Sequence, residues 1–592
     1  MKLNPWAKVG TLAAVVLASV ALLGGSVIVS NSPGNFNAGL TRPVGNGDTP
    51  GGLLRLGSSA PCDSLDPAQT FDPWCAVVHR TFSRNLMSFA GKPGEQGLIV
   101  VPDLVSDLPV TNADKTSWTF KLRPDVFWSD GSAVTATDVK YSIQRLYDDA
   151  LQSPVALDTL CLLSTCNAGT PDYKGPYAAP TEDLVSIITP DERTITFNLN
   201  RSFFEFSRLL ATPQFAPIQK ARDISLLAAG STYAANPASN GPFVLTIEQA
   251  SLQYSFTKNE LWTQASDGIR IPKVDAMSWK VFPDADTTDQ ALLSGEIDVK
   301  LNYGLAQIAR DASLAERSQR SLIDNPEMSF VNFLVVNPSV APLDRAPCRD
   351  AIFYALDKAD LQNLRGGSAS AAIAHSLSPP TILGYDSSYN PYPSGSDESG
   401  NLNRARQSLA QCGYPDGFQL NMAFVEIGIG RDIFLSAQKS LARIGIVVDP
   451  VEYANFAEYF TTGLGSPETL SAQEIGLATT GWGPDYSSAY SFWAPLTDGR
   501  KIKPSSNLNF AELNLDELNL LLDSLEAAEL PSELGRISRA IELLVMSEAV
   551  YLPYAVDRMV LYRPKELTDI YVQIALGNQY DLVNIGKREN FQ

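Results

Sequence analysis

Histidine is nearly missing from this chain: only His79 and His375 occur among 592 residues. A metal site built from several imidazoles, or a catalytic centre that uses histidine as its base, therefore has almost no material. The signatures GxSxG, GxxxxGK[ST] and HExxH, and GxGxxG after a strand, are absent as well. We predict no catalytic residue, no metal site and no cofactor, and we expect capture of a ligand rather than its conversion.

Positive charge is also scarce, because 45 Lys and Arg face 65 Asp and Glu and leave a formal net charge of −20. This field repels phosphate backbones, so nucleic acid is excluded as a partner. With 44% hydrophobic and 19% charged residues, 40 Gly and 39 Pro, the composition is that of a loop-rich globular protein. The length of 592 residues corresponds to roughly four domain-sized units, so we expect two or more lobes.

The N-terminus carries an uncharged apolar stretch at residues 9–29, behind two lysines. This pattern predicts export. Its length fits both a cleaved signal peptide and a retained membrane anchor, so we interpret residues 1–30 as one or the other. Either one places the rest of the chain outside the cytoplasm, at the cell surface or in the periplasm. Residues 31–52 are rich in Gly, Asn and Pro, which predicts a flexible linker.

Six cysteines in an exported chain favour disulfides, and six allow fifteen pairings. Pairing Cys62 with Cys75 and Cys161 with Cys166 would close two short local loops. This leaves Cys348 and Cys412 to pair with each other. Buried free thiols remain an alternative for the last pair. A metal site is disfavoured, because the chain has no CxxC and neither histidine lies near two cysteines.

Strands and helices are mixed along the chain. Alternation of apolar and polar residues, or β-branched and aromatic runs, predicts strands at 53–57, 116–122, 194–199, 251–257, 277–282, 330–336, 445–451, 474–480, 549–556 and 559–562. Helical spacing predicts helices at 286–294, 348–364, 402–412, 513–529 and 532–546. Thr135 and Asp138 fit a capping box at the start of another helix. No repeat of fixed period is present, which excludes solenoids and propellers.

Several segments resemble one family in the same order along the chain. The stretch Trp118 to Gly131 (WTFKLRPDVFWSDG), followed by VTATDV at 134–139, is the most specific match. The others are LDP at 65–67, NGPF at 240–243, DQALLSGEID at 289–298, VNF at 331–333, CRDAIFYALDK at 348–358, RARQSLAQCGYPDGF at 404–418 and WGPDY at 482–486. Together they resemble the extracytoplasmic solute-binding proteins of ATP-binding cassette importers, in the oligopeptide- and dipeptide-binding branch.

The resemblance implies an α/β, two-lobed periplasmic-binding-protein-like fold with an inserted subdomain and a ligand cleft between the lobes. It places the first lobe at 53–88, 181–302 and 551–592, its inserted subdomain at 89–180, and the second lobe at 303–550. Closure by hinge bending follows, because a ligand that contacts both lobes favours the closed state.

The resemblance also suggests ligand-binding residues. In the family's peptide receptors an aspartate after the tryptophan pairs with the peptide α-amino group, and Asp485 holds the matching position, with Trp482, Gly483 and Tyr486 beside it. Core packing remains open for Trp482 and Tyr486, and a turn or cap for Asp485. Ser487, Ser488 and Ala489 replace the family's usual Pro-Asp-Pro-like turn.

Three further expectations concern the loop at 69–74 and the two histidines. Residues 69–74 occupy a place that reaches the ligand in the family, although the cysteines at 62 and 75 also suggest a stapled surface loop. His79 is expected to be a structural histidine in a helix, and His375 to be solvated.

The functional expectation is a monomeric receptor that delivers a peptide or peptide-like ligand to the membrane permease of an ATP-binding cassette importer. A receptor for another solute, a secreted hydrolase acting on peptides or glycans, and a peptide sensor without transport remain alternatives.

Overall fold

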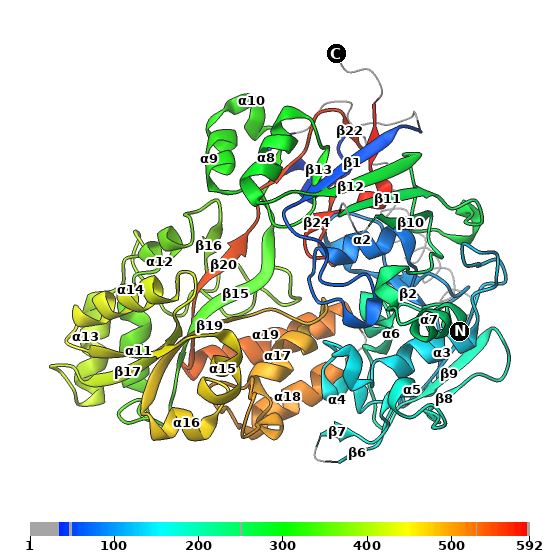
Figure 1. Ribbon diagram of the computed structural model, residues 1–592. Coiled ribbons are helices and arrows are strands. Elements are labelled where there is room, and N and C mark those ends of the chain that lie inside the picture. The colour runs from blue at the N-terminus through cyan, green and yellow to red at the C-terminus, as the bar shows by residue number, and fades with distance from the viewer. Residues whose placement is uncertain (1–34, 46–49, 168, 249–251, 529, 589–592) are drawn as a thin grey trace, which may run out of the picture.

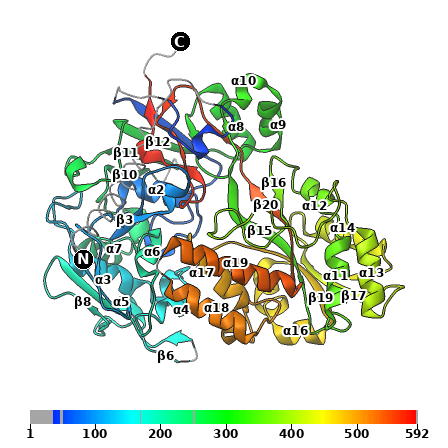
Figure 2. The ribbon, with the colours of Figure 1, turned by 180° about the vertical axis from the view of Figure 1, so that it is seen from behind.

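The computed structural model describes residues 35–45, 50–167, 169–248, 252–528 and 530–588. They form two α/β lobes that lie side by side, with a smaller subdomain below the first lobe (Figure 1). The view from behind shows the same arrangement, with the helices around α17 (Ala489–Thr497) and α18 (Asp516–Ala527) against the subdomain (Figure 2). The expected two-lobed fold is confirmed.

The first lobe is built on a five-stranded sheet in the order β10-β11-β12-β1-β13. Strand β1 runs parallel to β12 and β13, whereas β10, β11 and β12 are successively antiparallel. Its strands are β1 (Leu53–Ser58), β10 (Phe243–Glu248), β11 (Gln253–Lys258), β12 (Ala276–Val281) and β13 (Val299–Lys300). Trp279 fixes the centre of this sheet, since its ring stacks on Tyr254 at 4.1 Å and its Nε1–H donates to Ser58 Oγ.

The subdomain contains a four-stranded sheet in the order β4-β5-β9-β8, made of Val110–Thr111, Ser117–Lys121, Thr194–Asn198 and Ile187–Ile188. Trp118 and Phe120 of β5 are buried on one face, as the alternation predicts. Helix α3 (Ala136–Arg145) begins with the predicted capping box of Thr135 and Asp138. The predicted end of the subdomain at residue 180 is wrong, because β8 and β9 complete this sheet.

The second lobe contains a six-stranded sheet in the order β16-β20-β15-β19-β17-β18. Its strands are Ala371–Ile373, Tyr551–Arg558, Glu327–Val336, Ile475–Trp482, Gln419–Val425 and Val447–Tyr453. Helices α11 (Ala346–Ala355), α12 (Lys358–Leu364), α13 (Leu402–Cys412), α14 (Gly430–Ala442), α16 (Pro467–Ala472), α17 (Ala489–Thr497), α18 (Asp516–Ala527) and α19 (Pro531–Ser547) belong to the same part of the chain. The single helix predicted at 348–364 is two helices, since Leu356 is extended and Asp357 caps α12 by accepting from Asp360 N–H.

Two lobe boundaries differ from the prediction. Residues 303–326 pack with the first lobe rather than the second, because Leu305 and Ile323 join a cluster with Phe282 and Val560. Strand β20 (Tyr551–Arg558) lies in the sheet of the second lobe, although we expected the first lobe to resume at residue 551. The chain therefore passes between the lobes just before β15 and just after β20.

Part of the predicted flexible linker is instead packed on the first lobe. A short 3-10 helix, η2 (Ala38–Leu40), places the Gly39 N–H 2.8 Å from Asp324 Oδ1, and Val44 forms a bridge with Ile570. The linker prediction is therefore wrong for residues 35–45. The export signal at 1–30 lies outside the described residues, and within those residues we find no helix long and apolar enough to cross a membrane.

All three predicted disulfides are present: Cys62–Cys75, Cys161–Cys166 and Cys348–Cys412. The alternative of free thiols for the last pair is wrong. The last disulfide ties α11 to α13, with Cα atoms 5.2 Å apart, and both its residues are buried.

A buried ion network braces the first lobe near its subdomain. The Asp103 carboxylate accepts from Arg84 Nε at 2.7 Å and from Arg270 Nη2 at 2.9 Å, and Asp267 pairs with Arg270 at 3.0 Å. These side chains are almost fully buried, so each guanidinium depends on its carboxylates for compensation.

Candidate functional site

The candidate site lies in the loop that follows β19. The strand ends at Trp482, and α17 begins at Ala489 after a cap in which Ser488 Oγ accepts from the N–H groups of Tyr490 and Ser491. All four residues predicted to bind ligand, Asp485, Trp482, Gly483 and Tyr486, are therefore on one short segment at the end of a central strand. This segment faces the first lobe, as its contacts show.

The first lobe meets this loop through residues that the motif comparison did not identify. Glu205 is buried, and its Oε2 accepts from Ser488 Oγ and, at 3.3 Å, from the Tyr486 hydroxyl. Arg208, on the short helix α6 (Phe206–Leu209), donates from Nη1 to the Ser487 carbonyl at 3.0 Å. Burial raises the pKa of the Glu205 carboxyl, while its hydrogen bonds act in the opposite direction.

A second set of contacts between the lobes is made by residues that follow this loop in the chain of the second lobe. Lys501 of the second lobe pairs with Asp158 of α4 (Leu157–Leu160) at 2.8 Å, and Arg201 pairs with Glu526 of α18. Partly exposed pairs of this kind contribute only about 0–1 kcal/mol each. The two lobes are thus in contact through these ion pairs as well as through the loop after β19.

Asp485 stands out among the predicted residues because its carboxylate has no direct partner among the described residues. The residue is exposed, and among the described residues its carboxylate accepts no hydrogen bond and forms no ion pair. Desolvation by the nearby protein raises the pKa of Asp485 to about 6. The Asp158 charge acts in the same direction, whereas Lys501 opposes it. Such a carboxylate would gain from pairing with a cation.

Trp482 has a clear structural role. Its Nε1–H donates to the Phe492 carbonyl at 2.9 Å, and its half-buried ring packs against the main core. Tyr486 is likewise half-buried against the core and is bonded to Glu205. Packing and ligand contact are compatible for both residues, since each leaves part of its surface open.

Gly483 lies where β19 and β15 approach closely. A Cβ at this position would sit 3.0 Å from the Ser329 carbonyl oxygen and 3.3 Å from the Phe330 ring. The glycine therefore permits tight contact between two strand ends at the edge of the second lobe. The exposed Phe330 ring covers this edge.

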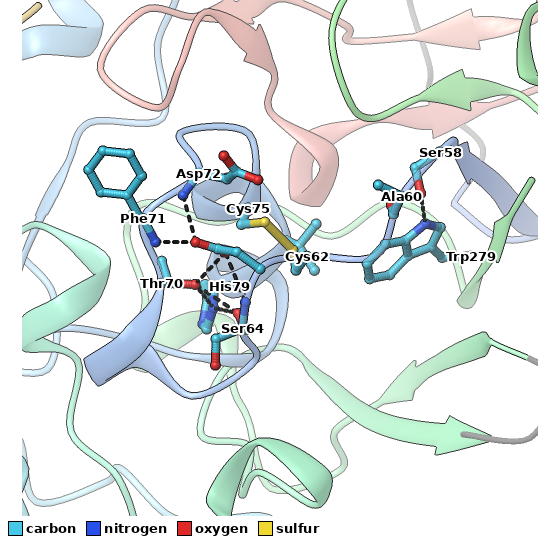
Figure 3. The surroundings of a disulfide bond; sticks show 12 residues. Ser58, Ala60, Cys62, Ser64, Thr70, Phe71, Asp72, Cys75, His79 and Trp279 are labelled. Carbon is cyan, nitrogen blue, oxygen red and sulfur yellow. Dashed lines mark hydrogen bonds between the residues drawn. A yellow bond between two sulfur atoms is a disulfide. The ribbon is translucent and has the colours of Figure 1, made fainter. Parts of the chain in front are cut away.

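The loop at residues 69–74 is fixed by the Cys62–Cys75 disulfide (Figure 3). Asp63 accepts from the backbone N–H groups of Phe71 and Asp72, and the Phe71 side chain points away from this turn and is 70% exposed. The Cys75 sulfur is in the disulfide, so the neighbouring Asp63 and Asp72 are the only two free metal donors in this cluster. That set is too small to hold a metal without further ligands.

The two histidines differ in outcome. His79 is buried in α2 (Cys75–Phe82), with Nε2 3.0 Å from Thr70 Oγ1 and 3.1 Å from the Ser64 carbonyl, so its structural role is confirmed. His375, expected to be solvated, is half-buried, with 28% of its side chain exposed. Among the described residues its Nδ1 has no hydrogen-bond partner, and its Nε2 lies 3.5 Å from Glu398 Oε1.

Comparison with known proteins identifies relatives over almost the whole chain. The family model of the bacterial extracellular solute-binding proteins, family 5, matches residues 100–504. The glutathione-binding protein GsiB of Salmonella typhi is 23% identical over 528 residues, covering 88% of this chain and 91% of the relative. The probable D,D-dipeptide-binding periplasmic protein DdpA of Escherichia coli K12 is 25% identical over 519 residues, covering 86% and 89%.

Solved structures agree. The clavulanic acid biosynthesis oligopeptide binding protein 2 is 35% identical, with a TM-score of 0.85, and the match covers 94% of this chain and 99% of that one. The unliganded open form of the murein tripeptide binding protein MppA is 18% identical with a TM-score of 0.71, covering 94% and 99%. Sequence, fold and motif order lead to the same conclusion, and the chain belongs to the bacterial extracellular solute-binding proteins, family 5.

Proposed function

We propose that this protein captures peptides or peptide-like solutes between its lobes and that Asp485 pairs with the ligand α-amino group. The observation that carries this proposal is the Asp485 carboxylate, which has no direct hydrogen-bond or ion-pair partner and lies near the contact between the lobes. An ammonium group satisfies such a carboxylate through a charge-assisted hydrogen bond. Relatives support the ligand class, because one is named for glutathione, one for dipeptides and one for oligopeptides.

The lobes act as two rigid bodies in this proposal. The first comprises residues 35–326 with 559–588, including the subdomain, and the second comprises 327–558. A ligand held on Asp485, Gly483 and the open faces of Trp482 and Tyr486 would meet the first lobe only after closure. Binding would therefore shift the population toward the closed state, which Glu205 stabilises through Tyr486 and Ser488.

We further propose that the closed receptor acts as a monomer outside the cytoplasm and delivers its ligand to the permease of an ATP-binding cassette importer. Residues 1–30 would direct export and, where retained, tether the protein to the membrane. The ligand would be released unchanged.

The decisive experiment is native mass spectrometry of the exported chain, first as purified and then with glutathione and a mixture of di- to pentapeptides. A complex whose extra mass matches an intact peptide is expected. The same peptides with acetylated N-termini serve as the matched control, and they should bind at least about tenfold more weakly because the ammonium is lost. Cleaved products, or equal binding of acetylated peptides, would contradict the proposal.

A further inference from the structure

The chain passes between the lobes just before β15 and just after β20, and these two crossings lie side by side. The Met559 N–H donates to the Pro326 carbonyl at 3.2 Å. On the first-lobe side the crossings continue into β14 (Ile323–Asp324) and β21 (Leu561–Tyr562), which pair with each other antiparallel. Rotation of one lobe against the other must change backbone torsions at these few residues. Contacts that hold them therefore influence which arrangement of the lobes is favoured.

The N-terminal segment that contains η2 lies directly on the first crossing. The Asn37 N–H donates to the Ile323 carbonyl at 2.8 Å. The Gly39 N–H donates to Asp324 Oδ1, also at 2.8 Å. The Asn37 side-chain oxygen Oδ1 accepts from the Asn325 N–H at 2.7 Å. Three consecutive residues that lead into β15 are thus held by an element that precedes β1 in the chain.

The backbone of this segment is shaped for the contact. Asn37 adopts the left-handed conformation, with φ 64°, which asparagine tolerates better than most residues. Gly39 approaches the crossing so closely that a Cβ there would collide with the Asp324 carboxylate. Each position therefore requires the residue type that it has, and a flexible linker would impose no such requirement.

Asp324 couples the segment to a buried network. The Asp324 carboxylate is fully buried, and its Oδ2 lies 3.1 Å from Arg563 Nη1 and accepts from the Tyr580 hydroxyl at 2.8 Å. The same guanidinium donates from Nη2 to the Asn35 carbonyl at 3.2 Å. A buried carboxylate depends on each of its partners for compensation. The segment is therefore part of the network that anchors the first crossing.

Asn325 extends the contact to the other crossing and to the second lobe. Its Nδ2 donates to the Met559 carbonyl and to the Ala369 carbonyl between α12 and β16, both at 3.0 Å. Its backbone N–H is the group that Asn37 holds. Because Ala369 belongs to the second lobe, its bond to Asn325 crosses the boundary between the lobes. These bonds favour the relative placement of the lobes in which they are made.

A cavity separates part of the segment from the second lobe. Its volume is about 630 Å³, and its wall contains Phe36 and Leu40 from the segment and Pro380 and Arg558 from the second lobe. The Phe36 side chain is 43% exposed. This space leaves room for the lobes to move, so we assign the influence of the segment on their arrangement to Asn325.

We propose that residues 35–45 form a hinge clamp and that Asn37 and Asn325 are positioning residues for the closure of the lobes. Through them the clamp holds both crossings and favours the arrangement in which Glu205 reaches the loop after β19. The proposal goes beyond ligand capture and requires only the two-lobed fold, so it does not depend on which solute the protein binds.

Interlobe distances in the ligand-free, full exported chain test this directly. All six cysteines are in disulfides, so one cysteine introduced on each lobe can carry a spin label selectively. Thr246→Cys on β10 and Lys439→Cys on α14 place the labels at exposed positions of the first and second lobe. Pulsed electron double resonance then measures the populations of interlobe distances, and the wild type should populate the distance of this structure.

Asn37→Gly removes the acceptor oxygen but permits the left-handed backbone, so it isolates the hydrogen bond to Asn325. The population at the distance of this structure should fall at least about threefold, since one hydrogen bond to the crossing is lost. Asn325→Ala should shift the populations in the same direction. Asn37→Asp keeps an acceptor oxygen and should restore the wild-type distribution. Thr41→Ala, an exposed change in the same segment, is the matched control and should behave like the wild type.

Thermal unfolding of the same variants separates a hinge clamp from a merely structural segment. A lowered thermal midpoint in Asn37→Gly with unchanged interlobe distances would overturn the proposal. A population shift that Asn37→Asp fails to reverse, or that Thr41→Ala shares, would overturn it as well, and so would a wild type that lacks the distance of this structure. No ligand is present in these measurements, so a failure of peptide binding leaves their outcome unchanged.

Discussion

Peptide affinity should fall when the pH is lowered from 7 to 5, because Asp485 has a pKa of about 6 in the ligand-free site. An ammonium group pairs only with the ionised carboxylate, so the bound ligand must lower this pKa. The stabilisation of the complex is then fully present above pH 6 to 7 and is progressively lost as the pH falls through the pKa of the free site.

The magnitude follows from this pKa. With a value of about 6, roughly nine-tenths of Asp485 is ionised at pH 7 and roughly one-tenth at pH 5. If the bound form stays ionised at both pH values, the Kd rises about tenfold, which corresponds to about 1.4 kcal/mol. A ligand whose amine is blocked should show no such slope.

Isothermal titration calorimetry at pH 7, 6 and 5 measures this directly, with the peptide identified by native mass spectrometry. Asp485→Asn keeps the shape of the side chain and should bind weakly, with a flat pH profile. Glu205 also has a raised pKa, so Glu205→Gln is the necessary second variant and should retain the slope. A Kd that changes less than about twofold in the wild type, or an unchanged slope in Asp485→Asn, would refute the assignment of Asp485.

Local chemistry made much of the fold predictable from the sequence. The capping box at Thr135 specifies where α3 begins, and the alternation around Trp118 and Phe120 specifies which face of β5 is buried. The short spacing of Cys62 and Cys75 was likewise a sufficient reason to pair them. These features depend on residues close together in the chain, which a sequence displays directly.

Features that depend on distant partners could not be predicted in this way. The segment at 35–45 resembles a linker in composition, yet Asp324, far along the chain, holds Gly39 in place. Glu205 carries no motif, and its importance comes from Tyr486 and Ser488, nearly half the chain away. The position of Asp485 was predictable from family resemblance, whereas its missing partner and raised pKa were not, because both arise from how the lobes meet.

Three further predictions concern stability and closure. Replacing Cys348 and Cys412 together by Ala should lower the free energy of unfolding by about 4 kcal/mol, as expected for a loop of sequence separation 64, and a loss below about 1 kcal/mol in urea denaturation would contradict the chain-entropy argument. Asp103→Ala removes a carboxylate that pairs with two buried guanidinium groups, so it should lower the free energy of unfolding by about 3–5 kcal/mol, measured by thermal unfolding. Glu205→Ala removes the acceptor that bonds Ser488 and Tyr486 across the lobes, so the closed state should lose about 1–3 kcal/mol of stability relative to the open state. Small-angle X-ray scattering should then show a larger radius of gyration without ligand and an affinity titration a Kd raised about fivefold or more, since closure must be restored by the ligand. Glu205→Gln keeps an acceptor oxygen and should behave like the wild type in scattering, and equal radii for the wild type and Glu205→Ala would show that these contacts do not hold the lobes together.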